Sequence, residues 1–283
     1  MRAWLEAEWQ RRGGGALLLL PFAILFALAV RLRRALYRRG LLRTWRADVP
    51  VIVVGNVTVG GTGKTPLVIA IVERLRAHGW TPGVVARGYG RVPPREQDPR
   101  GVVRVLPDVA TPEHFGDEPV LIARRSRVPV YISPDRVAAT RALLEAEAGV
   151  NVVVCDDGLQ HYALGRDVEI AAVDGERRFG NALALPAGPL REPVARLAEV
   201  DAVVVNGPSD VALPAVPRFT MHLGEERFVS LATGEARELW RVSPSDRPRL
   251  FEATVATDAS TLVYSLSSET SDLYVVEPAK PDR

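Results

Sequence analysis

The stretch Thr58-Val59-Gly60-Gly61-Thr62-Gly63-Lys64-Thr65 decides the fold class of this chain. It follows the apolar run Val51–Val54 and precedes an apolar-periodic segment from Pro66, which is the order strand, glycine-rich turn, helix. Glycines allow a tight turn with inward-pointing N–H groups, Lys64 adds a positive charge, and the Thr65 hydroxyl can hold Mg²⁺. All eight residues are therefore predicted to bind nucleotide phosphate, although Thr58 replaces the usual glycine. The alternative, a glycine turn that caps an ordinary buried helix, does not account for Gly63-Lys64-Thr65 at the helix mouth.

Downstream of this loop, short apolar runs alternate with helical patterns. Because the runs are apolar on both faces, they favour a parallel sheet covered by helices on both sides. The predicted fold class is therefore α/β, a mostly parallel sheet like that of the phosphate-loop nucleoside triphosphatases, with Val152–Cys155 as a central strand. Strands are expected at 51–54, 83–86, 102–106, 128–132, 152–155, 168–173 and 202–205, and helices at 64–78, 119–125 and 134–148.

The bulk composition describes a packed protein that is close to neutral. The chain has 283 residues, 47% of them hydrophobic, and a formal net charge of +2. That length suits one large α/β domain or two smaller ones, and so small a net charge gives no indication of nucleic-acid binding. Cys155 is the only cysteine in the sequence, so no internal disulfide can form, as is usual in a reducing compartment.

An uninterrupted apolar run, Ala16–Val30, is the exception to this picture. Its 15 residues are slightly fewer than the roughly 17–25 that cross a bilayer as a helix, and arginines flank it, with more of them after it. That excess would hold the C-terminal flank in the cytoplasm and attract anionic lipid head groups. Three interpretations stay open. The first is a cleaved signal peptide, and the second is burial against the protein's own core. The third, which is favoured, is membrane association, either as a helix in the inner leaflet or as a single short span.

Two acidic motifs follow predicted elements and can carry chemistry. Asp156 and Asp157 end the central strand, where a protein with such a loop holds or orients Mg²⁺, and the alternative is a polar turn. Adjacent side chains point different ways, so one aspartate can face the metal and the other a neighbour. Asp117 and Glu118 stand at a predicted helix start, where spacing alone favours an N-terminal cap over a base that accepts a hydroxyl proton.

Arginines also gather in glycine- and proline-rich turns. Arg177 and Arg178 precede Phe179-Gly180-Asn181, and Arg191-Glu192 ends the run that starts at Pro186. Guanidinium groups in ordered turns suit phosphate contacts. A lone Arg or His in a loop is nevertheless more often exposed to solvent, and this caution covers Arg87, Arg91, His161 and Arg166.

Six ordered motifs together resemble a known family, the tetraacyldisaccharide 4′-kinases, which are the lipid A 4′-kinases of Gram-negative bacteria. The resemblance covers roughly residues 31–239 and includes the hydrophobic N-terminus, and the family tolerates threonine at the position of Thr58. The motifs that carry it are Val54–Pro66, Arg87–Gly90, Gly116–Pro119, Asp156–His161, Asp174–Asn181 and Leu185–Glu192.

This resemblance implies an activity and a set of site residues. ATP, with Mg²⁺, would phosphorylate the 4′-hydroxyl of a tetraacylated disaccharide 1-phosphate at the cytoplasmic face of the inner membrane, giving lipid IVA. Lys64 and Thr65 would handle the phosphates and the metal, Asp156 would be the metal-side carboxylate, and Asp117 would be the catalytic base rather than a cap. The site would also be lined by Arg87, Glu118, Asp157, Gln160, His161, Arg191 and Glu192.

The C-terminal part departs from the family pattern. The family has a smaller C-terminal lobe that supplies a histidine partner for the base, whereas no histidine follows His222 here. Arg247–Phe251 faintly resembles a family segment, which suggests a frameshifted or truncated reading of the gene. The expected organisation is a membrane helix with a basic stretch at 1–46, a kinase domain at 47–242 and an atypical tail at 243–283, read as a sheet-edge extension with one strand near 261–266, or as partly disordered.

Three functions remain compatible with these features. The leading one is a membrane-associated lipid kinase that needs the disaccharide lipid and a membrane surface, with no nucleic acid and no obligate protein partner. The others are a phosphate-loop ATPase or regulator that phosphorylates no lipid, and an inactive copy of the kinase.

Overall fold

The computed structural model describes residues 8–11, 13–88, 101–207 and 210–221, and the backbone of three C-terminal strands at 250–255, 262–267 and 271–276. By its internal contacts the chain divides into two compact units, Met1–Leu223 and Gly224–Arg283. The boundary expected between 242 and 243 lies outside the described residues, as do Arg91 and the last two residues of the Arg87–Gly90 motif.

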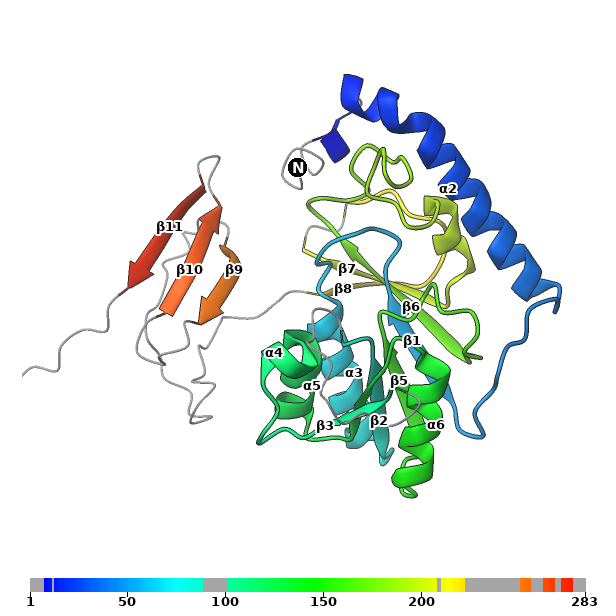
Figure 1. Cartoon of the computed structure of the whole chain (residues 1–283), viewed down its shortest axis with the longest axis vertical. Coiled ribbons are helices and arrows are strands. Elements are labelled where there is room, and N and C mark those ends of the chain that lie inside the picture. Colours follow the sequence, from blue (N-terminus) through cyan, green and yellow to red (C-terminus); the bar gives the residue numbers. More distant parts are fainter. Residues whose placement is uncertain are drawn as a thin grey trace, which may run out of the picture. The chain divides into compact units, whose positions relative to one another are not determined.

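The first unit is built on a mostly parallel eight-stranded sheet, as predicted (Figure 1). Its order is β3-β4-β2-β5-β1-β6-β7-β8, which places β5 near the centre, and only β3 runs antiparallel to its neighbour. The strands are β1 Val51–Gly55, β2 Pro82–Ala86, β3 Val103–Val105, β4 Val130–Ile132, β5 Val152–Asp156, β6 Val168–Asp174, β7 Ala202–Asn206 and β8 Arg218–Met221. β8 was not predicted from the sequence.

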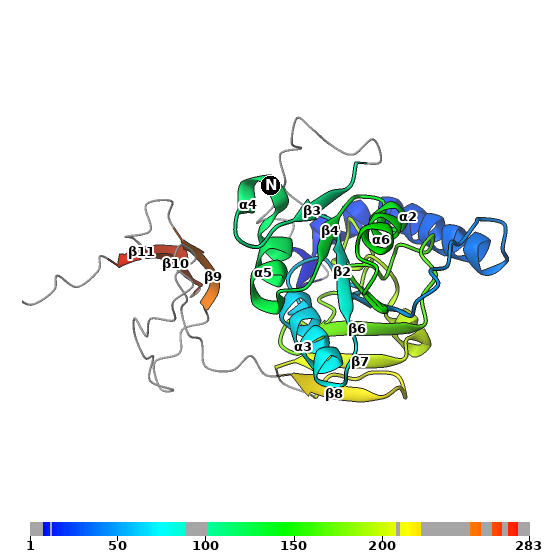
Figure 2. The same ribbon diagram turned by 90° about the horizontal axis from the view of Figure 1, so that it is seen from below.

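Helices cover both faces of this sheet, which confirms the predicted layering (Figure 2). Side chains of α3, Lys64–Ala77, and α5, Asp117–Ser126, join one buried cluster, and those of α6, Arg136–Ala146, and η1, Val194–Glu199, join the other. The short α4, Pro112–Phe115, leads into α5. Since alternate β1 residues point to opposite faces, Val53 lies in one cluster and Val54 in the other.

The N-terminal apolar run forms the helix α2, Gly14–Arg38, which lies along one side of the first unit (Figure 1). By length and composition alone it is able to cross a membrane, with a mean hydropathy of 2.3. Only Ala16 and Ala23 of this helix are buried, while Leu18 and Leu25 are 76% and 64% exposed. Burial against the protein's own core is therefore not the role of this run.

The C-terminal residues form a second, separate sheet. β9 Leu250–Val255, β10 Leu262–Ser267 and β11 Ser271–Val276 are antiparallel in the order β11-β10-β9. The expectation of one strand that extends the main sheet is therefore wrong. The three strands follow one another closely in the sequence and pair only within this sheet.

Candidate functional site

The glycine-rich loop leaves β1 at Gly55 and is held by its own side chains and by a second loop. The Asn56 side-chain amide donates to Thr62 Oγ1 over 3.2 Å. Thr58 forms an isolated bridge with Leu190, and the Val59 N–H donates to the Pro189 carbonyl over 2.8 Å. The Pro186–Glu192 motif therefore supports the loop from outside, a role that only the folded chain reveals.

Two glycines of the loop are required by its geometry. Gly63 is the N-cap of α3 with φ of 81°, and a Cβ there would lie 2.8 Å from Asn206 Nδ2. Gly60 has φ of 101°, and a Cβ there would lie 3.0 Å from a terminal nitrogen of Arg177. The left-handed backbone disfavours any larger residue at both positions. Arg177 thus holds its guanidinium over the loop, which is where the sequence predicted a phosphate contact from composition only.

Lys64 opens α3 with its charge directed to the end of β5. Its residue is 8% exposed, and Nζ lies 3.7 Å from Asp157 Oδ1. Arg191 Nη1 donates to both Asp157 oxygens over 2.9 and 3.0 Å. Burial by itself raises the pKa of the Asp157 carboxyl, but Lys64 and Arg191 together outweigh it and hold that pKa below its usual range. Asp157 is therefore an ionised partner of two cations.

Asp156 has the opposite environment, as expected for adjacent side chains that point different ways. It is 2% exposed, and its Oδ1 has no hydrogen-bond partner among the described residues. Burial raises the pKa of Asp156 to about 7, and the neighbouring charge of Glu118 adds to this. A buried, unpartnered carboxylate oxygen at the tip of the strand beside Thr65 suits a cation ligand, because a cation would supply the missing partner.

The Gly116–Pro119 motif begins α5, two residues earlier than predicted. Proline at the third helical position costs nothing there, because the N–H groups of the first turn have no helical acceptor. Gly116 is the N-cap and has no side chain to cap this end, so Asp117 is not the capping residue, although Asp117 and Glu118 both lie in the first helical turn, as predicted. Desolvation raises the pKa of Glu118, which lies within electrostatic reach of Lys64, Asp117 and Asp157. The exposed Asp117 therefore stands at the rim of the same charge cluster.

A buried arginine that the sequence analysis did not select lies beneath the two aspartates. Arg136 is 3% exposed and donates to the Ser133, Asp156 and Asp157 carbonyls over 2.9, 3.3 and 3.5 Å. It fixes the backbone from which both carboxylates project. Its position early in α6 resembles that of an ordinary surface arginine, so no sequence signal identified it.

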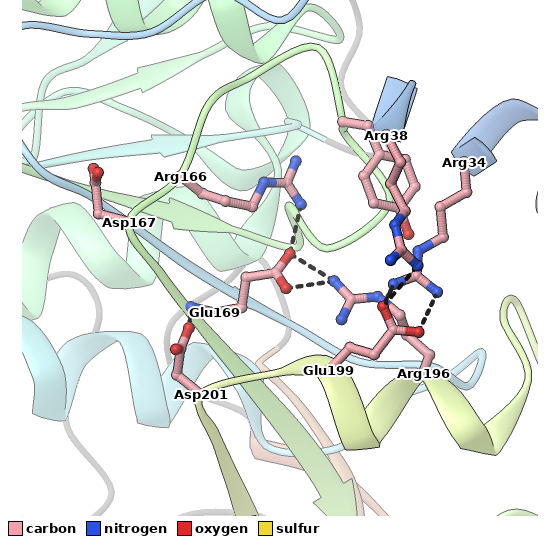
Figure 3. A pocket seen from close by; sticks show the side chains of 9 residues that line it. Arg34, Arg38, Arg166, Asp167, Glu169, Arg196, Glu199 and Asp201 are labelled. Atoms are coloured by element: carbon pink, nitrogen blue, oxygen red, sulfur yellow. Dashed lines mark hydrogen bonds and ion pairs between the residues drawn. The ribbon is translucent and has the colours of Figure 1, made fainter. Parts of the chain in front are cut away.

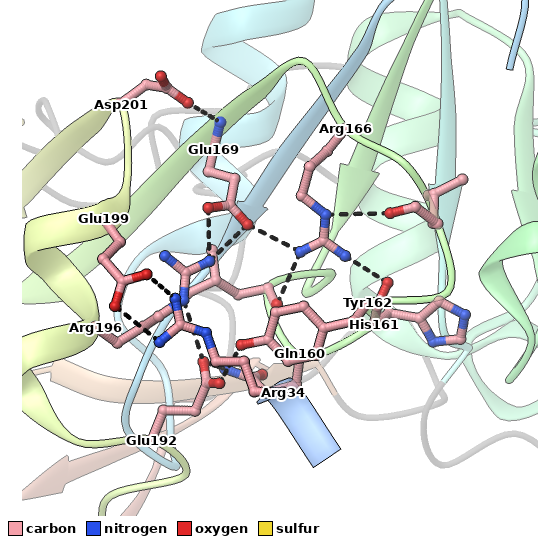
Figure 4. Close-up of polar contacts among 12 residues, drawn as sticks. Arg34, Gln160, His161, Tyr162, Arg166, Glu169, Glu192, Arg196, Glu199 and Asp201 are labelled. Carbon is pink, nitrogen blue, oxygen red and sulfur yellow. Dashed lines mark hydrogen bonds and ion pairs between the residues drawn. The ribbon is translucent and has the colours of Figure 1, made fainter. Parts of the chain in front are cut away.

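Three other predicted site residues lie at different depths. His161 has its pKa lowered to about 4 by burial and by the charge of Arg136, so its ring is neutral at pH 7. Glu192 is 2% exposed and accepts hydrogen bonds from Tyr162 and from Gln160, whose amide also donates to the Asn56 carbonyl over 2.9 Å (Figure 4). Gln160 therefore contacts the backbone at the start of the glycine-rich loop, and Glu192 holds the Gln160 amide in place.

Arg87 lies just beyond the end of β2 and is exposed. The carboxyl ends of β1, β2 and β5 meet at one edge of the parallel sheet, so Arg87 shares that edge with the loop and with Asp156.

The helix α2 reaches this loop cluster directly. Arg33 donates to the Gln160 carbonyl over 2.9 Å, and its guanidinium lies over the rings of Tyr37 and Tyr162, 5.3 and 5.9 Å from their centroids. The apolar helix and the candidate site are therefore connected through the loop that follows Asp157.

Asp156→Asn is expected to stabilise the metal-free protein at high pH. With its pKa raised to about 7, the folded wild type binds a proton that the unfolded chain releases near pH 4, so wild-type stability falls as pH rises between these values. Asparagine carries no charge to desolvate. The melting temperature of the variant minus that of the wild type, measured in EDTA, should be small near pH 4 and rise to a plateau of roughly 3–10 °C above pH 7. A difference that does not change with pH would contradict the raised pKa.

Comparison with known proteins finds one family and many related sequences. A sequence model of the family described as Tetraacyldisaccharide-1-P 4′-kinase matches residues 15–263. The chain is 51% identical over 219 residues to the tetraacyldisaccharide 4′-kinase of Aeromonas salmonicida, covering 77% of this chain and 63% of that protein. It is 46% identical over 234 residues to that of Methylobacillus flagellatus, covering 83% and 67%. The match to that of Xanthomonas euvesicatoria is 56% over 204 residues, covering 70% and 56%.

A solved structure shares the fold. It is the crystal structure of the "apo" form of LpxK from Aquifex aeolicus in complex with ATP, which is 30% identical with a TM-score of 0.66 and covers 79% of this chain and 70% of that one. The matched part of this chain spans 56–67% of the length of the three curated relatives described above.

Proposed function

Because the chain belongs to the tetraacyldisaccharide-1-P 4′-kinase family, we propose that it transfers the γ-phosphoryl group of ATP to the 4′-hydroxyl of a tetraacyldisaccharide 1-phosphate. The observation that carries this proposal is the meeting at the mouth of α3 of Lys64, Asp157 and the Asp156 carboxylate, whose Oδ1 has no partner in the part of the chain that the structure describes. The ATP complex of the related Aquifex aeolicus protein supports ATP as the donor.

The residues divide into roles that their positions support. The N–H groups of Thr58–Thr65 and the Lys64 ammonium would bind the β- and γ-phosphates, with Arg177 above Gly60 as a further cation. Asp117, exposed at the rim, would accept the proton of the 4′-hydroxyl as that oxygen attacks phosphorus. Arg191 and Asp157 would keep Lys64 in place, and Arg87, Glu118 and His161 would line the acceptor side.

The donor set also fits Mg²⁺. Thr65 is 8% exposed, and the Asp156 oxygen that lacks a partner is the kind of hard oxygen ligand that this ion prefers. When bound with ATP, Mg²⁺ would neutralise charge on the transferred phosphoryl group. Thr65 and Asp156 are the residues that would hold it.

We also propose that α2 lies in the plane of the cytoplasmic leaflet of the inner membrane. Its N-terminal end is tied to the first unit, because Glu8 accepts from the Ala16 N–H and Asn181 donates to the Glu8 carbonyl. Its other end is tied by the ion pair of Arg34 with Glu199. A helix held to one body at both ends presents its outer face to lipid, which favours in-plane attachment over a span.

The three-part organisation at 1–46, 47–242 and 243–283 is likewise a proposal. The compact unit Met1–Leu223 contains the proposed membrane helix and most of the kinase domain. The tail would then replace most of the smaller lobe seen in the family pattern.

The activity is tested with the full chain, labelled ATP, Mg²⁺ and the disaccharide 1-phosphate lipid in detergent. The expected result is a labelled lipid product that requires all components. ATP hydrolysis without labelled lipid would instead identify an ATPase or regulator, and ATP binding with neither reaction would identify an inactive copy.

A further inference from the structure

A cavity of about 330 Å³ lies where the C-terminal half of α2 meets the rest of the first unit (Figure 3). Four arginines line it, two from α2 and two from the body. They are Arg34, Arg38, Arg166 and Arg196. The cavity sits beside the starts of β6 and β7, so it is at the edge of the sheet opposite the glycine-rich loop.

Most of the carboxylates in this cavity already have partners that fix them. Asp167 accepts from the Val51 N–H over 2.8 Å, and Asp201 accepts from the Glu169 N–H over 2.7 Å. Glu169 binds both body arginines, with distances of 2.9 Å from Arg166 and 2.6 Å from Arg196 (Figure 4). These three acids therefore build the wall of the cavity.

Arg196 is a fixed cation in the wall of the cavity. The residue is 2% exposed, and its Nη2 donates to both Glu169 oxygens over 2.6 Å. Its side chain also hydrogen-bonds Tyr162, and its Nε lies 3.8 Å from Glu192 Oε2. These partners hold Arg196 in place, so the arginines that can exchange a partner are those of α2.

Glu199 occupies the place where an acceptor from outside would bind. Its carboxylate bridges Arg34 and Arg38, which are one helical turn apart, and its side chain is 40% exposed. An exposed carboxylate can swing out into water, which would free both guanidinium groups at once. Two arginines at this spacing suit the oxygens of one phosphate.

We propose that this cavity is a binding site for a phosphate group, that of an anionic phospholipid, which displaces Glu199 from Arg34 and Arg38. The lipid source follows from position, since the cavity adjoins a helix whose outer face is apolar and exposed. The proposal rests on the membrane attachment proposed above. It adds a headgroup site that is separate from the phosphate loop.

The test is flotation of the full chain with vesicles of phosphatidylcholine alone or with added phosphatidylglycerol. Three proteins are compared with the wild type. Arg34→Gln with Arg38→Gln removes two charges from the cavity, Arg31→Gln with Arg39→Gln removes two exposed charges elsewhere on the same segment, and Glu199→Gln removes the competing carboxylate.

Diffuse attraction to anionic lipid falls by about fivefold for each arginine lost, so both pairs lose some affinity. The cavity pair should lose roughly tenfold more than the control pair, because it also loses charge-assisted hydrogen bonds. Glu199→Gln should bind anionic vesicles more tightly than the wild type. Equal losses in the two pairs with no gain for Glu199→Gln would overturn the proposal.

A second arm separates the lipid from free phosphate. Inorganic phosphate is added to the Lys64→Ala variant, in which the glycine-rich loop has lost its ammonium group and competes less, and the melting temperature is recorded with and without the cavity pair. One outcome is that phosphate raises the melting temperature only when Arg34 and Arg38 are present, while the cavity pair and the control pair bind vesicles equally well. That outcome would support a phosphate site and overturn the lipid as its source. Binding to neutral vesicles reports on α2 attachment alone, so its loss counts against the proposed membrane attachment and not against the cavity.

Discussion

Asp117→Ala is expected to abolish phosphoryl transfer while ATP binding stays nearly unchanged. The carboxylate is exposed at the start of α5, within reach of the charge cluster around Lys64, but it makes no capping contact that would hold the helix. Removal of a general base typically lowers the rate by roughly 10²–10⁴. The turnover number would be measured with saturating lipid, and the Kd for ATP would be measured by calorimetry.

Glu113→Ala is the matched control, because Glu113 is an exposed carboxylate on the neighbouring helix α4. It should leave both quantities near wild type. Asp117→Asn keeps the shape but not the basicity, so it should be as inactive as the alanine variant. An active Asp117→Asn, or loss of ATP binding in either variant, would argue against the base assignment.

Leu25→Asp combined with Leu28→Asp should release the protein from membranes. Both leucines are exposed on α2, 64% and 54%, and would contact lipid in the proposed membrane attachment. A charge placed among acyl chains costs up to about 3 kcal/mol on insertion scales, so two should weaken partition to vesicles by roughly 10²–10⁴. The measurement is flotation with phosphatidylcholine vesicles.

The control for this pair is Val109→Asp, a charge at an apolar side chain that is 70% exposed but lies far along the chain from α2. It should float like the wild type. The nucleotide-binding affinity of the α2 variant should also be retained, since α2 contributes no residue to the glycine-rich loop. Unchanged flotation of the leucine variant would exclude α2 as the membrane-contacting surface.

The sequence was sufficient for most of the main sheet because its signals are local. Runs such as Val152–Cys155 are apolar on both faces, which only a covered parallel sheet can bury, and Gly63-Lys64-Thr65 specifies a loop by backbone geometry. The signals failed where partners are distant or patterns weak. β8 is only four residues long and its side chains are largely exposed, so it lacks the apolar run of a buried strand. β9 and β11 both pair with β10 and not with a strand of the main sheet.

The candidate site shows the same division. Spacing predicted roles for Lys64, Asp156 and Asp157, and the structure brings Lys64 within 3.7 Å of Asp157. For Asp117 the spacing favoured a cap, because a carboxylate near a helix start is usually a cap. The folded chain instead has Gly116 at that position. No motif in the sequence indicated Arg136. Its hydrogen bonds to the Asp156 and Asp157 carbonyls depend on how α6 packs against the sheet.

The sequence by itself determined the phosphate loop, the parallel sheet and the apolar helix, since each depends on residues adjacent along the chain. Only the tertiary structure decided that Asp156 is buried with an oxygen that has no hydrogen-bond partner among the described residues, whereas Asp157 is paired with Lys64 and Arg191. It also decided that Glu199 pairs with Arg34 and Arg38 of α2. Charge environments and hydrogen-bond partners are set by residues that come together from distant parts of the chain, and local patterns carry no record of them.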